Sequence, residues 1–323
     1  MPAYNPLTLS LLVLSVAVVV LYAGSRLLWA SVSSTGLWRG VVMATPLIVL
    51  GVVLSAWSPP SAVALMVSSA VLAMTLGLGV STLDISPDEA EASPLLRLPL
   101  PLIAVVCLAG FHGELSWPVL VAIVVVGGLT LWSADGDRLR HAVPAKAWLA
   151  WPAAVLLMTG LIAVAAATLL FRRASGSGAG TPVTVLLTTP AVCLALLGLL
   201  TAEAKEVRPQ MPQETAVGVA IAALGFGLPL VVLASHVTRP LFNRFASGSE
   251  TLARVAATQP ADAPVWMPVS TWRVDSVLLL VVSILLLPFA AGRMKLGRAE
   301  GMALVVLFLA YAAVATRTGA MTG

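Results

Sequence analysis

The stretch VVMATPLIVLG (residues 41–51) has the apolar character of a membrane span, but Thr45 and Pro46 interrupt it. The same Thr-Pro pair returns 144 positions later as Thr189-Pro190, in VLLTTPAVCLALLG (residues 185–198). Proline removes one backbone N–H and frees a carbonyl one turn back, and lipid offers neither group a partner. We therefore expect both Thr-Pro steps to lie against protein or a wet cavity, where the freed groups can act as ligands.

The composition is that of an integral membrane protein. Of 323 residues, 59% are hydrophobic and only 10% are charged, which leaves too little polar surface for a water-soluble globule. A helix that crosses a bilayer needs about 20 mostly apolar residues. We therefore predict an all-α protein with about ten transmembrane helices, at residues 7–30, 39–57, 60–83, 95–112, 116–133, 148–171, 181–202, 212–237, 273–292 and 298–316.

The positions of the basic residues predict the orientation. The positive-inside rule makes the side with more Lys and Arg cytoplasmic. In the first half, this rule places the N-terminus outside the membrane, which we expect to be the plasma (inner) membrane. Ten spans then place the C-terminus outside as well, although the second half carries basic residues on both sides. The net charge of +4 is spread over loops without a basic run, so we expect the lipid bilayer as a partner and no nucleic acid. The basic loop residues on the inner side of the first half are Arg26, Arg39, Arg97, Arg138, Arg140 and Lys146.

The connector near the middle of the chain leaves five spans on each side. Residues 1–134 are expected to form one five-helix repeat and residues 148–323 a second one, with a cytoplasmic connector at 135–147. Because five is odd, the two halves must enter the membrane from opposite faces, which is a recurrent transporter architecture. The Thr-Pro pairs lie in the second helix of each half, and the third helix ends in Gly77-Leu78-Gly79 or Gly225-Phe226-Gly227.

The end of the chain resembles the calcium/cation antiporter superfamily, whose sodium/calcium exchangers consist of two inverted five-helix halves. Residues 274–315 resemble the last two helices of that family, with Arg298-Ala299-Glu300-Gly301 as the R-x-E-G that opens the final span. A weaker copy, residues 101–132, stands where the first half should end. The resemblance implies an exchanger-like fold for most of the chain. Within it, Glu300 fits a structural role in the first turn of the last helix.

The resemblance also implies where cation ligands should lie, and there the sequence departs from the family. Family members carry G-[ST]-S-x-P-E at a helix break in each half, followed by G-N-x-x-G-S-N in the next helix. With the family proline on Pro46 and Pro190, Leu47 and Ala191 replace the glutamates. A second register, Ser58-Pro59-Pro60-Ser61, also lacks the glutamate. Ca²⁺ usually requires carboxylate ligands, so the sequence poorly supports Ca²⁺ exchange.

Hydroxyl groups and one carboxylate remain as candidate ligands. Counting back from the two Gly-x-Gly steps places Ser68-Ser69 and Glu214-Thr215 at the Gly-Ser positions of the family. Glu214, at the start of the eighth helix, could carry a proton or be a helix-terminal charge that faces water. The candidate substrate- or ion-binding residues are Thr45, Ser68, Ser69, Thr188, Thr189, Glu214 and Thr215, next to the helix-break residues Pro46 and Pro190.

No motif predicts an enzyme, a cofactor or a metal centre. The acidic stretch at 84–91 could mimic the aspartate-rich motifs of membrane prenyltransferases, but a solvated loop explains it more simply. The histidines lie in different segments without metal-ligand spacing. Cys107 and Cys193 fall within apolar spans, where we expect them to be packing residues. No nucleotide-binding motif appears.

Two functions remain open. The leading hypothesis is a secondary transporter that moves a cation or a small polar solute by alternating access, with a monovalent cation or proton as candidate cargo. The alternative is a non-transporting membrane scaffold, or a subunit of a membrane complex, that keeps the exchanger fold. A membrane-protein partner would then contact the long loop at 238–272, which is rich in Trp and Pro.

Overall fold

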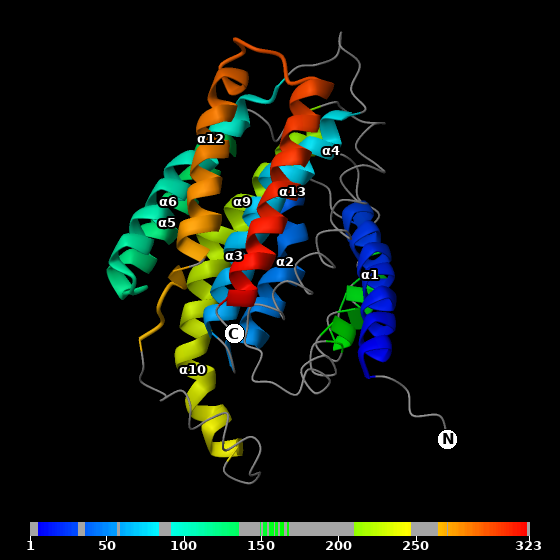
Figure 1. Cartoon of the computed structure of the whole chain (residues 1–323), viewed down its shortest axis with the longest axis vertical. Coiled ribbons are helices and arrows are strands. Elements are labelled where there is room, and N and C mark those ends of the chain that lie inside the picture. The colour runs from blue at the N-terminus through cyan, green and yellow to red at the C-terminus, as the bar shows by residue number, and fades with distance from the viewer. Residues whose placement is uncertain are drawn as a thin grey trace.

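The computed structural model is a bundle of helices, most of which lie side by side along its long axis (Figure 1). It describes residues 6–31, 36–56, 59–83, 92–135, 210–246, 264–269 and 271–321, with scattered positions between 149 and 167. Six helical segments in this part of the chain are long and apolar enough to cross a membrane. The prediction of an all-helical integral membrane protein is confirmed.

Eight of the ten expected spans have a helical counterpart. The seventh, at 181–202, lies outside the described residues, and the sixth is described only in part. In the first half the elements are α1 (Pro6–Ser31), α2 (Gly36–Ser55), α3 (Pro59–Leu72), η1 (Ala73–Gly77), α4 (Leu78–Leu83), η2 (Pro94–Arg97), α5 (Pro99–His112) and α6 (Trp117–Asp135). In the second half they are α9 (Met211–Ala222), η6 (Ala223–Gly227), α10 (Leu228–Ala246), η7 (Thr271–Ser276), α12 (Val277–Ala290) and α13 (Arg298–Met321).

Local sequence accounts for several helix ends. Pro99 stands in the first turn of α5, where its missing N–H removes no helical hydrogen bond. Gly113 and Gly292 follow α5 and α12 with φ of 76° and 69°, which is a conformation that favours glycine. At the start of α13, the Glu300 Oε2 atom accepts a hydrogen bond of 2.9 Å from the Gly297 N–H. This contact confirms the structural role expected for Glu300.

α10 extends further than the sequence predicts. We expected the span to end at residue 237 and a loop to occupy 238–272, but the helix continues through Pro240 to Ala246. One proline removes a single hydrogen bond and does not end a helix whose neighbouring turns are intact. The start of the expected loop, from residue 238 to Ala246, is therefore helical.

The chain before η7 forms a short extended pairing with the turn between α5 and α6. The Leu115 N–H donates to the Val265 carbonyl at 3.0 Å, and the Met267 N–H donates to the Gly113 carbonyl at 2.7 Å. Trp266 lies across from Glu114 in this pairing. These bonds satisfy backbone groups at the end of the bundle and hold the start of η7 against α5.

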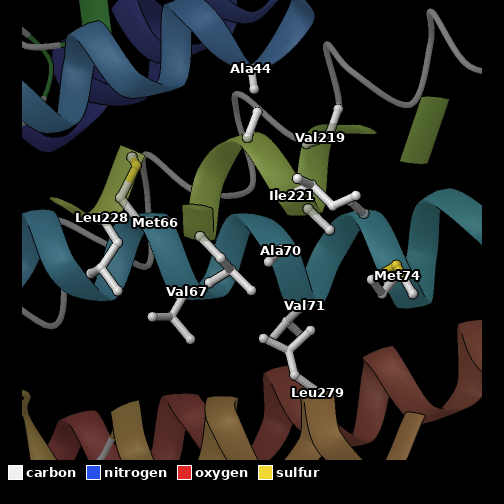
Figure 2. Close-up of a cluster of buried hydrophobic side chains, with 14 of the residues drawn as sticks. Ala44, Met66, Val67, Ala70, Val71, Met74, Val219, Ile221, Leu228 and Leu279 are labelled. Carbon is white, nitrogen blue, oxygen red and sulfur yellow. The ribbon is translucent and has the colours of Figure 1, made fainter. Parts of the chain in front are cut away.

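The spans that contain α3 and α9 form the centre of the bundle. In each of these two spans, 83% of the most apolar 18-residue stretch is buried inside the protein. In the span of α6 the buried share is 33%, and its outer face carries exposed apolar side chains. Figure 2 shows the side chains that fill this centre, and they come from α2, α3, η1, α9, α10 and α12. They include Ala44, Met66, Val67, Ala70, Val71, Met74, Val219, Ile221, Leu228 and Leu279.

α2 and α9 approach each other so closely that their backbones touch. A Cβ atom at Gly40 would overlap the Thr215 carbonyl oxygen and lie 2.8 Å from the Gly218 Cα atom. A Cβ atom at Gly218 would overlap the Leu37 carbonyl oxygen. Small residues at such positions let transmembrane helices pack at short distance. The sequence of these two helices thus determines how they can meet.

We predict that Gly40→Val destabilises the protein much more than Gly128→Val does. The valine side chain introduced at position 40 would have to push α2 away from α9, and overpacking of this kind costs about 2 kcal/mol or more. Gly128 lies on the exposed face of α6, and a Cβ atom there would meet no atom within 4 Å. Thermal unfolding of both variants in detergent provides the measurement. Equal unfolding temperatures would show that the close contact of α2 with α9 does not support the fold.

Candidate functional site

The candidate ligands of the first half lie in two different environments. Thr45 is exposed on α2, in line with Val49 and Val53, which are also exposed. Residues four apart share one face of a helix, so this face of α2 points away from the core. Ser68 and Ser69 are instead buried on α3. The Thr45 hydroxyl is therefore at the surface, whereas those of the two serines are enclosed.

The buried candidate hydroxyls bond to carbonyls of their own helices. Ser68 Oγ donates to the Ala64 carbonyl and Ser69 Oγ to the Leu65 carbonyl, both at 2.6 Å. Thr215 Oγ1 donates to the Met211 carbonyl at 2.8 Å. Bonds of this kind to the preceding turn are common for Ser and Thr in membrane helices. These hydroxyls thus have a donor role within the fold, and only their lone pairs remain for a ligand.

Glu214 is buried, although it lies in the first turn of α9. Its exposed fraction is 3%, so the expectation of a water-facing charge is wrong. The carboxylate occupies space that Gly36 leaves open on α2, because a Cβ atom at Gly36 would lie 2.8 Å from Glu214 Oε2. Arg39, also on α2, is buried at the same end of this contact. A pair of oppositely charged residues is therefore enclosed where α2 and α9 begin.

The neighbouring Gln213 ties α9 to the first half of the chain. Its Oε1 atom accepts a 2.7 Å hydrogen bond from the Ser93 N–H, just before η2. Thr188, Thr189 and Pro190 lie outside the described residues, so their part in a site stays a prediction.

Two π-helical turns stand at matching places in the central helices, η1 directly after α3 and η6 directly after α9. η1 ends at Gly77, the first glycine of its Gly-x-Gly step, and η6 ends at Gly227, the second glycine of its step. The two ends are 150 residues apart. π turns leave the regular hydrogen-bond pattern and are frequent at functional sites. Aligned on these turns, Ser68 corresponds to Gly218. Counting back from the Gly-x-Gly steps matches Ser68 with Glu214 instead, which lies four residues, or about one helical turn, before Gly218.

The region where α2, α3 and α9 meet is lined by apolar side chains (Figure 2). Ala44, Ala70 and Val219 lie in it, together with Met66 and Ile221. In the part of the chain that the structure describes, no group of three or more His, Cys, Asp or Glu side chains gathers. The described helices thus bring none of the carboxylate clusters that Ca²⁺ sites usually contain.

Asp275 on η7 is a buried carboxylate that the sequence analysis did not single out. Its exposed fraction is 7%, and it accepts a hydrogen bond from the side chain of Tyr311 on α13. In the sequence it stands close to the expected start of a span at 273, where a charged residue is ordinarily at the interface. In the folded bundle η7 packs against α3 and α5, and Asp275 is buried. In the sequence, Asp275 could be found as the single acidic residue within the apolar segment 273–292.

Solved structures of the sodium-calcium exchanger NCX_Mj have the same fold. The structure of that protein soaked with 10 mM Na⁺ and zero Ca²⁺ matches with a TM-score of 0.59 and 18% identity, over 95% of this chain and 99% of that chain. With 2.5 mM Na⁺ and 10 mM Sr²⁺ the TM-score is 0.61 and the identity 20%, over 95% and 99%. Without Na⁺ and Ca²⁺ the values are 0.59 and 20%, over 94% and 98%.

The likeness to the exchanger lies in the fold and not in close sequence identity. No protein-family model and no curated protein sequence matches this chain. The structural match nevertheless extends over nearly the whole of both proteins, and it agrees with the resemblance of residues 274–315 to the last two helices of the family. The chain is an integral membrane protein that shares the fold of the sodium-calcium exchanger NCX_Mj.

Proposed function

We propose that the protein is a secondary transporter that moves a monovalent cation, a proton or a small polar solute by alternating access. The observation that carries this proposal is the pair of π turns in two central helices that run in opposite directions. Gly36 and Gly40 of α2 meet Glu214 and Gly218 of α9 in the same order, so α2 and α9 are parallel. α3 follows α2 after a short turn and runs back, antiparallel to α9 (Figure 1).

Two glycine contacts support an arrangement as two inverted five-helix halves. A Cβ atom at Gly79 of α4 would lie 2.9 Å from the Gly301 carbonyl oxygen of α13. A Cβ atom at Gly127 of α6 would lie 3.0 Å from the Gly225 Cα atom of η6. In each case the third helix of one half meets the last helix of the other half. Transporters built from such repeats hold their cargo between the halves, near the midplane of the membrane.

The chemistry of the described residues favours a cargo of low charge. A hard divalent cation needs several carboxylates, whereas a monovalent ion or a neutral solute can be held by hydroxyl and carbonyl oxygens. Ser68 and Ser69 of α3 and Thr215 of α9 supply hydroxyl oxygens, and Glu214 supplies a buried carboxylate at the start of α9, against Gly36 of α2. Thr188 and Thr189 remain candidates in the second half, whereas Thr45 lies at the surface of α2 and does not face the centre of the bundle. We also propose that both termini lie outside the plasma membrane.

A non-transporting scaffold is the second candidate function. The apolar packing between α3 and α9 favours it, because Val and Met side chains leave few polar groups at the centre (Figure 2). A partner protein would then contact the segment between residues 238 and 272. The two candidate functions differ in one measurable property, which is solute flux.

We expect reconstituted protein to carry a flux of Na⁺, K⁺ or H⁺ across liposome membranes, and Glu214→Gln to reduce it by about tenfold or more. Loss of one charge-assisted contact to the cargo is worth about 1.5–3 kcal/mol, which corresponds to at least a tenfold effect. Glu114→Gln is the matched control, because Glu114 lies in the turn between α5 and α6, outside the contact of α2 with α9.

The flux experiment separates the two functions. An absence of flux for all three ions, with protein that remains folded, would overturn transport of these ions and favour the scaffold. Flux that is equal in wild type and in Glu214→Gln would keep a transporter but remove Glu214 from its site. Ser69→Ala and Thr215→Val then test the hydroxyls in the same assay.

We further predict that Ca²⁺ does not raise the unfolding temperature of the purified protein. A ligand that binds only the folded state stabilises it by about 2.7 kcal/mol when its concentration is 100 times the Kd. Since the described helices bring no carboxylate cluster together, Ca²⁺ should behave like Mg²⁺ at equal ionic strength in a thermal-unfolding titration. A saturable rise with Ca²⁺ that Mg²⁺ does not produce would contradict the proposal of a cargo of low charge.

A further inference from the structure

A second buried polar region lies away from the contact of α3 with α9, where η7 leads into α12. Asp275 and Ser276 are both enclosed there, with exposed fractions of 7% and 0%. The Cys107 Sγ atom of α5 donates to the Ser276 carbonyl at 3.0 Å. The Trp272 Nε1–H donates to the Cys107 carbonyl at 2.9 Å. These two bonds fasten η7 to α5, so the burial of Asp275 is a property of the folded bundle.

The aromatic ring of Trp272 closes the outer side of this region. It packs edge-on against Phe111 of α5, with ring centroids 4.6 Å apart. It also occupies the space next to Gly110, where a Cβ atom would overlap the indole ring. Asp275 therefore lies about one turn inside the span Trp272–Ala290, beneath an aromatic residue at the end of that span.

The charged groups around Asp275 leave its carboxylate without a cationic partner among the described residues. α3 and α12 contain no titratable residue, and α5 contributes Cys107 and His112. His112 and Arg273 are exposed. Tyr311 is thus the group that bonds to the carboxylate.

The hydroxyls of Ser276 and Ser283 are a second unusual feature of this side of the bundle. Both Oγ atoms are fully enclosed and have no hydrogen-bond partner among the described residues. Ser68, Ser69 and Thr75 show that a buried hydroxyl in these helices normally bonds to the preceding turn. Buried polar atoms without protein partners are ordinarily satisfied by water. Water next to Asp275 would supply and receive a proton.

We propose that Asp275 is a reversible proton-binding site in the membrane-embedded part of the protein. A hydronium ion gives up a proton to a carboxylate oxygen of Asp275. An O–H bond of the hydronium ion breaks, an O–H bond forms on the carboxyl group, and a neutral carboxylic acid and a water molecule result. The reverse step returns the proton to water. The enclosed position of Asp275 and its hydrogen bond with Tyr311 of α13 define this site. The proposal concerns residues outside the candidate transport site, so it stands or falls separately from the transport function.

Infrared difference spectroscopy of the lipid-reconstituted protein, titrated from mildly acidic to mildly alkaline pH, tests this site directly. A protonated carboxylic acid has a C=O stretching band that a carboxylate lacks and that shifts in D₂O. We expect such a band to appear and disappear reversibly with pH in wild type and in Glu114→Gln. We expect Asp275→Asn to lack this band.

Three outcomes would overturn the proposal. The first is a band that still titrates with pH in Asp275→Asn. The second is an Asp275 carboxyl that stays ionised over the whole pH range, and the third is one that stays protonated over that range. If Asp275→Asn does not fold, Tyr311→Phe decides, because it keeps the carboxyl and removes its hydrogen-bond donor. A change in the frequency or the titration midpoint of the band in Tyr311→Phe assigns it to Asp275. An unchanged band shows that another acid produces it.

Discussion

The backbone contact between α2 and α9 is the constraint on which the arrangement of this bundle depends. In a bilayer, apolar side chains gain little by leaving lipid for protein, so helix association relies on close packing and hydrogen bonds. Gly40 and Gly218 allow that close packing, and the order of the contacts makes the two helices parallel. Because α3 turns back from α2, it must then run antiparallel to α9. The positions of the two π turns on opposite sides of the centre follow from this contact.

The same physical setting explains where polar groups are found. Lipid cannot satisfy a hydroxyl or an amide, so most buried hydroxyls in the described helices bond to the turn before them, as Ser69 and Thr215 do. Glu214 is accommodated where Gly36 leaves room for it. Ser276 differs, because its enclosed hydroxyl has no hydrogen-bond partner among the described residues. Asp275 differs as well, because its partner is Tyr311 of another helix. Among the described residues, buried acids therefore lie at two separate places, Glu214 on α9 and Asp275 on η7.

The site was harder to predict than the spans. Span positions follow from local hydropathy, and eight of them are matched by helices. We expected the third helix of each half to end at its Gly-x-Gly step, but helix continues beyond both steps as α4 and α10, and a π turn ends at Gly77 and at Gly227 instead. Counting from the glycines therefore matched Ser68 with Glu214, one helical turn away from Gly218, with which the π turns match it. Thr45 and Asp275 illustrate a second limit, since a Thr in a span proved exposed and an acid near a span end proved buried.

The sequence by itself determined that the chain is a helical membrane protein, and it determined that no glutamate follows Pro46 or Pro190. Both are properties of short segments, because partition into lipid depends on about 20 consecutive residues and a missing side chain is missing in any fold. Only the tertiary structure decided which face of each helix is enclosed. Helix rotation depends on non-local contacts such as Gly40 with Gly218 and Cys107 with Ser276. The burial of Glu214 and Asp275 arises from those contacts, which join residues far apart in the chain.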